Sequence, residues 1–233
     1  MYQRTGLIVV AAGRGARFGG FKQLARVGND PLFVHALRSF DHLPFAQKLV
    51  VLPRAFFEDG IWDAIRAEYP ALADFQAVEG ADTRAGSVKA GLAALREECE
   101  FVAVHDGARP LPPIAATEAC LQALATRANV ACAIVVSPVT DTIKRISADG
   151  RRIEETIDRQ SLKRAETPQV ARRALLAAAL ETPGGEAATD EAQALELAGH
   201  ETVAIEHAGY NPKVTRADDL LVLNAYLSGA RES

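Results

Sequence analysis

Short apolar runs alternate along the chain with segments that have the spacing of amphipathic helices. The helical patterns lie near residues 31–41, 56–68, 84–97 and 112–127, and the apolar runs cover 6–10, 48–52, 75–79, 101–105 and 131–137. Strands that are apolar on both faces are typical of parallel sheets covered by helices. Because crossovers between parallel strands are right-handed, the alternation predicts an α/β fold with a doubly wound, mostly parallel, Rossmann-like sheet.

The alternation stops after Pro138. The polar segment that follows is divided by the turn signal Asp149-Gly150, which predicts an inserted β-arm at about 139–161. Such an arm either packs on a partner subunit or is a solvated surface hairpin. After it, the pattern predicts helices near 170–181 and 190–198, a strand near 202–206 and a last helix near 216–228. With no repeat or linker, we expect a single domain over 1–233.

Composition narrows the classes of function. The net charge of −4 over 233 residues argues against a general nucleic-acid surface. No apolar run has the length of a membrane span, and the N-terminal run is too short for a signal peptide, so we expect a cytoplasmic protein without a membrane partner. The three cysteines, Cys99, Cys120 and Cys132, have apolar neighbours and no paired spacing, which indicates reduced thiols in the core.

The stretch "AAGRGARFGGFK" at 11–22 directly follows the first predicted strand. Its glycine spacing is one residue too long for a dinucleotide fingerprint, and Lys22 is not followed by the Ser or Thr of a Walker loop. Glycines let backbone N–H groups converge on an anion, and Arg17 and Lys22 add positive charge. We interpret the stretch as a phosphate-binding loop; the alternative is a glycine-rich turn with solvated basic residues.

A second polar motif, "VHDGARP" at 104–110, follows the fourth predicted strand. In a doubly wound sheet this strand lies beside the first, so Asp106 and Arg109 would face the glycine loop across the switch point. A carboxylate beside a polyphosphate indicates a divalent cation between them, for which Mg²⁺ is the first choice and other divalent cations are possible. The alternative for Asp106 is a helix cap or turn. We expect His105 to be a packed structural residue.

A third motif, "EGADTRAGSVKAGL" at 79–92, follows the third predicted strand. Gly80 and Asp82 precede a helix that Arg84 and Ser87 open, and such a helix start can hold phosphate or contact a base edge. Ordinary helix capping explains Asp82 at least as well.

These motifs occur in order with "DTIKR" (141–145), "ETPQ" (166–169), "TDEA" (189–192) and "NPKVT" (211–215). The ordered set resembles the 2-C-methyl-D-erythritol 4-phosphate cytidylyltransferases, the IspD family, over nearly the whole chain. The resemblance implies transfer of CMP from CTP to 2-C-methyl-D-erythritol 4-phosphate with release of pyrophosphate, in non-mevalonate isoprenoid biosynthesis. It also implies Mg²⁺ dependence and a homodimer.

The resemblance assigns roles to residues motif by motif. The implied catalytic residues are Arg17, Lys22, Arg159 and Lys213, with Arg159 reaching the neighbouring subunit's site from the arm. The implied nucleotide site comprises Ala11, Ala12, Gly13, Gly15, Gly80, Asp82, Arg84, Ser87, Asp106 and Gly107, with Asp106 also at the metal. The residues implied around the acceptor are Arg109, Asp141, Thr142, Thr167 and Thr189.

The chain departs from the family pattern at four positions, with Phe21 where proline is usual, Gly107 where alanine is usual, and Tyr210 and Pro212 in the last motif. The glycine loop is also similar to that of molybdenum-cofactor cytidylyltransferases. One alternative is therefore a cytidylyltransferase for another polyol phosphate, such as ribitol 5-phosphate. A non-catalytic nucleotide-binding protein is a second alternative, and a dehydrogenase is a distant third.

Overall fold

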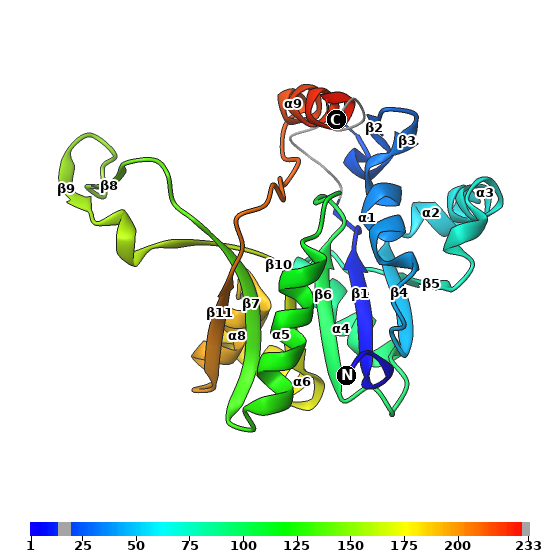
Figure 1. The fold of residues 1–233 in the computed structure, drawn as a ribbon, viewed down its shortest axis with the longest axis horizontal. Helices are drawn as coiled ribbons and strands as arrows, with labels where there is room; N and C mark the ends of the chain where they lie inside the picture. Colours follow the sequence, from blue (N-terminus) through cyan, green and yellow to red (C-terminus); the bar gives the residue numbers. More distant parts are fainter. Residues whose placement is uncertain (14–19, 230–233) are drawn as a thin grey trace.

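The computed structural model describes residues 1–13 and 20–229. At its centre is a seven-stranded sheet in the order β11-β7-β10-β6-β1-β4-β5 (Figure 1). β10 runs antiparallel to both neighbours, and the other pairings are parallel. The strands are β1 (Thr5–Val10), β4 (Gln47–Leu52), β5 (Phe75–Glu79), β6 (Phe101–Asp106), β7 (Val130–Pro138), β10 (Lys163–Arg172) and β11 (Glu201–Glu206).

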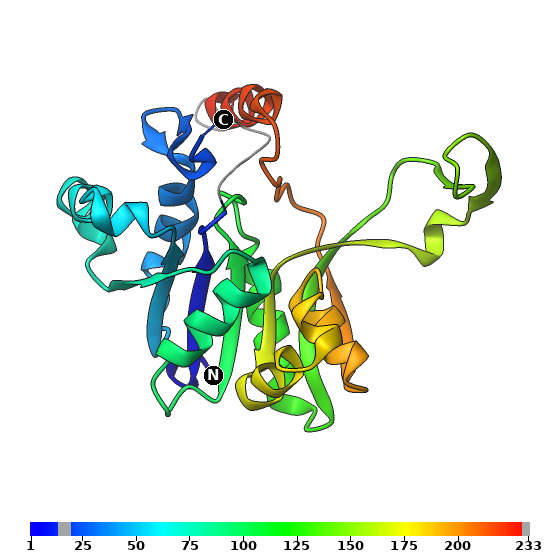
Figure 2. The same ribbon diagram turned by 180° about the vertical axis from the view of Figure 1, so that it is seen from behind.

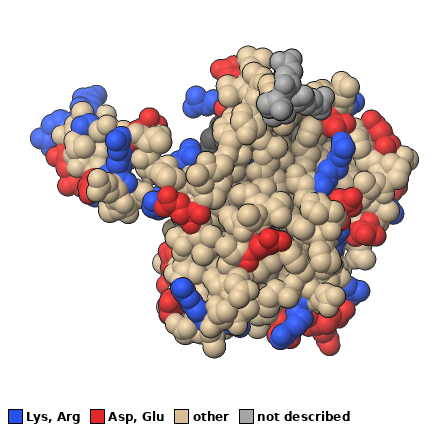
Figure 3. Space-filling model, viewed as in Figure 1, with Lys and Arg blue, Asp and Glu red and all other residues tan. Residues whose placement is uncertain are grey.

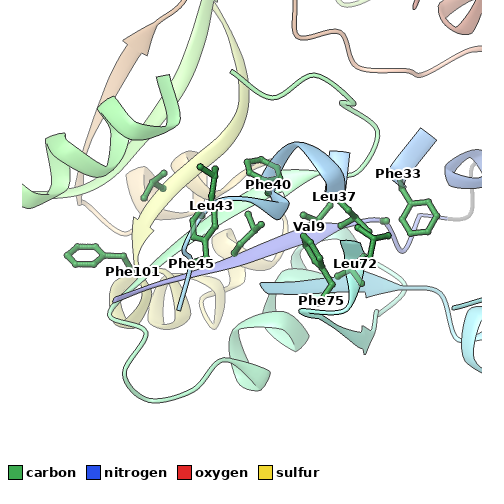
Figure 4. Packing of buried hydrophobic residues seen from close by; sticks show 14 of the residues in the cluster. Val9, Phe33, Leu37, Phe40, Leu43, Phe45, Leu72, Phe75 and Phe101 are labelled. Atoms are coloured by element: carbon green, nitrogen blue, oxygen red, sulfur yellow. The ribbon is translucent and has the colours of Figure 1, made fainter. Parts of the chain in front are cut away.

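Helices cover both faces of the sheet, which confirms the predicted doubly wound α/β fold. The helices α1 (Leu32–Asp41) and α5 (Ile114–Thr126) share one core cluster, in which Phe33, Phe40 and Val9 are fully buried (Figure 4). The helices α4 (Arg84–Ala94), α6 (Arg173–Leu180) and α8 (Glu191–Leu197) share the other, with Ile8. Successive residues of β1 point to opposite faces, and Thr5–Val9 are all buried, so the strand is covered on both sides.

The pairing of β1 with β6 positions the site. The two strands are parallel, with Val10 opposite Asp106 at their carboxyl ends. The segment that begins the glycine loop therefore emerges beside Asp106, as the sequence predicted.

The strand β10 was not predicted, and the predicted helix start near 170 is wrong because the chain is still extended there. The segment KRAETPQVAR is polar and contains Pro168, features that argue against a central strand. The structure accommodates them with a register shift between Ala165 and Gln169 in the pairing with β7. Residues 166–168 lie in this irregularity, where Pro168 removes no ladder hydrogen bond.

Several smaller elements also differ from the prediction. The helical pattern at 56–68 is divided at Gly60 into α2 (Ala55–Glu58) and α3 (Ile61–Glu68). The unpredicted elements are the two-residue strands β2 (Arg26–Val27) and β3 (Asp30–Pro31), the short helix α7 (Pro183–Glu186), and the 3-10 turns η1 (Tyr2–Arg4), η2 (Lys22–Leu24), η3 (Pro70–Leu72) and η4 (Arg159–Ser161). The predicted last helix is α9 (Ala217–Gly229), which packs Leu223 against Val27 and Leu32.

The inserted arm is a hairpin of β8 (Ile143–Ile146) and β9 (Ile153–Ile157), as predicted. Gly150 at its turn has a φ of 72°, which suits glycine. The arm projects away from the body of the molecule in both ribbon views (Figures 1 and 2). In the space-filling view its outer end carries charged residues of both signs, whereas the adjoining face of the body is mostly uncharged (Figure 3).

Cys99, Cys120 and Cys132 are free and buried, as expected from their neighbours. Burial raises the pKa of the Cys120 thiol to about 12, so it stays protonated. Within the ranges 1–13 and 20–229, no helix combines the length and apolar character needed to cross a membrane.

The close packing of α4 on β1 generates a stability prediction. A Cβ at Gly91 would lie 2.8 Å from Cγ2 of the fully buried Ile8. Gly91→Ala should therefore lower the free energy of unfolding by about 1–3 kcal/mol, although alanine is normally the better helix former. Urea unfolding checks this, with Gly229→Ala as control because a Cβ added there would meet nothing within 4 Å. Equal or higher stability of Gly91→Ala would contradict the packing argument.

Candidate active site

A cavity of about 330 Å³ lies at the carboxyl edge of the sheet. It is bounded by the end of β1, the residues after β6, the turn before α4 and the segment that precedes α9. The lining residues are Val10, Ala11, Ala12, Gly13, Lys22, Gln23, Leu32, Ala81, Asp82, Thr83, Arg84, Ser87, Asp106, Gly107, Ala108 and Lys213. The cavity thus joins the three motifs that the sequence analysis singled out with Lys213 from the last one.

The start of the glycine loop is held by Gln23, which sequence analysis did not select. The residue is 4% exposed, and its Nε2 donates to the carbonyls of Ala11 (2.6 Å) and Gly13 (3.1 Å). Together with the bond from the Ala11 N–H to the carbonyl of Val51 (2.8 Å), these bonds fix the backbone at the start of the loop. Gly15 and Arg17 lie outside the described residues. At the position where the family usually has proline, the Phe21 ring packs edge-on against Phe56, with centroids 5.4 Å apart.

The turn between β5 and α4 forms the opposite wall. A Cβ at Gly80 would lie 2.3 Å from the Cβ of Ala12, so glycine lets the two loops approach closely. The Ser87 hydroxyl bonds both the N–H (3.1 Å) and the carbonyl (3.2 Å) of Ala81 and thereby fixes the turn. Thr83, and not Asp82, caps α4 by accepting from the N–H of Gly86. The cap was detectable from the Thr that precedes the helical pattern.

Asp106 is the charged centre of the wall. Its carboxylate accepts from Arg84 Nε at 3.2 Å and from Lys213 Nζ at 2.7 Å. Burial opposes ionisation of this carboxyl, but the charges of Arg84 and Lys213 outweigh it and hold its pKa well below the usual range. Asp106 is therefore ionised in the folded protein at neutral pH.

Glu191, at the start of α8, is a site residue that sequence analysis missed. Its side chain is 1% exposed, and it binds both terminal nitrogens of Arg84, at 2.7 and 3.1 Å. Burial disfavours the charged guanidinium, but the carboxylates of Glu191 and Asp106 raise the pKa of Arg84 above its ordinary value. Such a bidentate pair fixes the guanidinium plane at the cavity wall.

His105 supports the wall from behind and is fully buried, as the sequence analysis expected. Burial lowers its pKa to about 4, so the ring is neutral at pH 7. Its Nε2 donates to the carbonyl of Arg109 at 2.8 Å, which leaves Nδ1 to accept from the Thr167 hydroxyl at 3.1 Å. The same hydroxyl accepts from the N–H of Asp106 at 3.1 Å. Thr167 thus ties β10 to the end of β6.

The two lysines of the cavity approach it from different segments. Lys22 Nζ donates to the carbonyl of Val214 at 2.7 Å, and the neighbouring Lys213 reaches across to Asp106. Together with Arg84, these side chains bring positive charge to the cavity from three separate segments.

Seven of the described residues expected at the site do not line the cavity of the single chain, and two of them, Gly80 and Thr167, adjoin its wall. Arg109 is buried and donates to the carbonyl of Asn211 at 2.8 Å. The other four are Asp141 and Thr142, which are exposed at the base of the arm, Thr189, which is exposed and bonded to Gln193, and Arg159, which donates to the carbonyl of Thr140. Thr167 stands behind the wall. Their roles toward substrate stay predictions.

Within the part of the chain that the structure describes, no three His, Cys, Asp or Glu side chains are grouped closely enough to hold a metal ion. Asp82 and Asp106 are the acidic residues in the described lining of the cavity, and Asp106 also binds Lys213.

Comparison with known proteins places the chain in a family. The family model described as 2-C-methyl-D-erythritol 4-phosphate cytidylyltransferase, IspD, matches residues 5–229. A protein of that name from Chromobacterium violaceum is 36% identical over 231 residues, which cover 97% of this chain and 98% of that protein. A bifunctional IspD/IspF enzyme from Desulfotalea psychrophila is 35% identical over 97% of this chain, but the chain spans 57% of that protein's length.

Solved structures are similar over the same span. The 4-diphosphocytidyl-2C-methyl-D-erythritol synthase of Anaerococcus prevotii superposes with a TM-score of 0.80 at 26% identity, covering 96% of both chains. The 2-C-methyl-D-erythritol 4-phosphate cytidylyltransferase of Thermus thermophilus has a TM-score of 0.74 at 26% identity, covering 95% of this chain and 98% of that one. This chain therefore belongs to the 2-C-methyl-D-erythritol 4-phosphate cytidylyltransferase family and is a CTP-dependent nucleotidyltransferase that transfers CMP to 2-C-methyl-D-erythritol 4-phosphate in isoprenoid biosynthesis.

Proposed function

We propose that the cavity at the carboxyl edge of the sheet is where CMP is transferred, with CTP phosphates between the glycine loop and Lys213. The observation that carries this proposal is the convergence of Lys22, Arg84 and Lys213 on one cavity from three separate segments. The cavity joins backbone of the glycine-loop start to the N-terminal turn of α4, and both are suited to anions. CTP and a polyol phosphate are the partners of such a site.

The reaction needs alignment and positive charge more than a strong base. An oxygen of the acceptor phosphate, which is already anionic, forms a bond to the α-phosphorus of CTP. The bond from that phosphorus to the bridging oxygen breaks, and pyrophosphate leaves with the electron pair. Fixed cations reduce the repulsion between the two anions and stabilise the charge that develops on the α-phosphate. The described cavity wall supplies cations in this arrangement and contains neither His nor Cys.

The predicted site residues form two groups, one for the nucleotide and one for the acceptor. We assign the nucleotide to the backbone of 11–13, Gly80, Asp82, Arg84, Ser87 and Gly107, with Arg17 and Lys22 on its phosphates. The acceptor is assigned to the side of Lys213, toward Arg109 and Thr167, with Thr189 and the arm residues Asp141, Thr142 and Arg159.

Asp106 fits the role of a magnesium ligand. Its carboxylate is ionised, reaches the cavity, and has lone pairs beyond those that Arg84 and Lys213 occupy. A site with one protein carboxylate suits Mg²⁺, which takes its remaining ligands from substrate phosphates and water. When bound, the ion would neutralise charge on the phosphate oxygens. The work of Asp106 itself is to hold Lys213 and Arg84 in place.

We also propose that the protein is a homodimer whose arms, at about 139–161, complete each other's sites. The arm projects from the body (Figures 1 and 2). It exposes Ile146 (46%) and Ile153 (64%), which are paired in the β8–β9 register. Exposed apolar pairs on an extended hairpin favour contact with another protein surface. Arg159 lies at the base of this hairpin, in η4.

Replacing Lys22 tests the catalytic assignment. Lys22→Ala should lower kcat on the order of a hundred- to a thousandfold, or about 2.7–4 kcal/mol, because a fixed ammonium stabilises the transition state more than the bound substrate. CTP affinity, measured by calorimetry, should change far less. Lys89→Ala is the matched control, since Lys89 lies outside the cavity and pairs with Glu181 and Glu186. A kcat near that of the unaltered enzyme would refute the role of Lys22.

Mixing inactive variants tests the shared site. If Arg159 acts in the partner's site, a heterodimer of Arg159→Ala and Lys22→Ala chains contains one intact site. An equimolar mixture, exchanged by dilution and reassembly, should then recover about a quarter of the wild-type activity, because half of the dimers are mixed and each has one working site. The separate variants serve as controls. No recovery in a mixture that light scattering shows to be dimeric would rule out the shared site.

A further inference from the structure

The segment between β11 and α9 carries Lys213 to the cavity without regular secondary structure. Its backbone is attached at its two ends, where the N–H of His207 donates to Val136 (3.0 Å) and the N–H of Val214 donates to Ala108 (2.9 Å). Between these points, side-chain contacts determine the path of the chain. The position of the Lys213 ammonium therefore depends on what holds residues 207–212.

Glu166 is the acceptor on which this segment converges. Its side chain lies in the register break of β10, and the residue is 4% exposed. Oε1 accepts from the Ser137 hydroxyl at 2.5 Å, while Oε2 accepts from His207 Nε2 and Asn211 Nδ2, each at 2.9 Å. A single buried carboxylate thus joins β7, β10 and two points of the irregular segment, His207 and Asn211.

The hydrogen bonds around Glu166 specify the orientation of each partner. Asn211 Nδ2 also donates to the carbonyl of Thr167 at 3.0 Å, which fixes the amide with Oδ1 on the other side. His207 Nδ1 accepts from the N–H of Gly209 at 3.1 Å, so Nε2 carries the proton that is donated to Glu166. The carbonyl of Asn211 accepts from Arg109. Asn211 is therefore held through both its side chain and its backbone.

The charge of Glu166 is matched by its surroundings. Arg109 and Arg164 lie 3.9 and 3.6 Å from its carboxylate oxygens. Burial opposes ionisation of this carboxyl, but the hydrogen bonds from Ser137 and His207 and the charge of Arg109 lower its pKa below the ordinary value. An ionised Glu accepts hydrogen bonds at both oxygens, whereas the amide nitrogen of a Gln would face donors at either position.

We propose that Glu166 is a positioning residue that sets the Lys213 ammonium in the active site through Asn211. The link is short and stiff, because Pro212 alone separates Asn211 from Lys213 and its ring fixes φ. A shift of Asn211 is therefore transmitted to Lys213, whose Nζ must reach Asp106 and the acceptor. The inference rests on the proposed function of Lys213.

A double-mutant cycle tests the proposal on the full-length enzyme. Lys213→Ala should lower kcat/KM for the acceptor on the order of a hundredfold, and Glu166→Ala about tenfold. In the Lys213→Ala background, Glu166→Ala should cost less than about twofold, because the group that it positions is gone. CTP affinity should stay within about twofold in all variants. Equal losses in both backgrounds would overturn the proposal.

Two additions keep the outcomes distinct. If Glu166→Ala does not fold, as judged by its thermal transition, the cycle is run with Glu166→Gln, which keeps the shape and loses the charge. Gln47→Ala is the matched control, since Gln47 is a buried polar residue that bonds Gln76 and Ala94 at the opposite edge of the sheet. Its effect on kcat/KM should be the same with and without Lys213. If Lys213→Ala had the same kcat/KM for the acceptor as the unaltered enzyme, the proposed function of Lys213 would be refuted, and with it this inference.

Discussion

The carboxylate of Asp106 is the group on which the arrangement of the site depends. It binds Arg84 from α4 on one side and Lys213 from the irregular segment on the other. Because the Asp106 side chain is 10% exposed, losing one cation would leave buried charge that is poorly compensated. Ion pairing thus orders the two cations before any substrate arrives, which is the preorganisation that charge stabilisation in catalysis requires.

The sheet supplies the rigidity behind this cluster. Asp106 ends a strand that is buried along its whole length, and its N–H is held by Thr167 from the neighbouring β10. The neutral ring of His105 completes the contact from the apolar side, where it meets Phe40 at 5.1 Å between centroids. Burying polar residues in the centre of a sheet costs free energy of folding unless they form hydrogen bonds, as these residues do.

The strand β10 connects the two halves of the site. Thr167 supports Asp106, and the preceding Glu166 supports the segment that carries Lys213. Both residues lie in the register break of the strand, where the backbone does not follow the ladder with β7. Pro168, which argued against a strand in the sequence, lies in the same register break, and such irregularities are common beside active sites.

The sequence by itself determined the architecture and the place of three polar motifs at the carboxyl edge of the sheet. Apolar runs of strand length, amphipathic helical spacing and turn signals are local. The first two predicted the parallel core and the carboxyl-edge position of the glycine loop and Asp106, and the Asp149-Gly150 turn signal predicted the arm. Only the tertiary structure decided the antiparallel strand β10 and the partners Glu191 and Glu166. Arg84 and Glu191 are 107 positions apart, as are Asp106 and Lys213, and no periodicity in a single sequence reports such a distance. These pairs form because the strand order brings their segments to one edge, where buried charges must find partners.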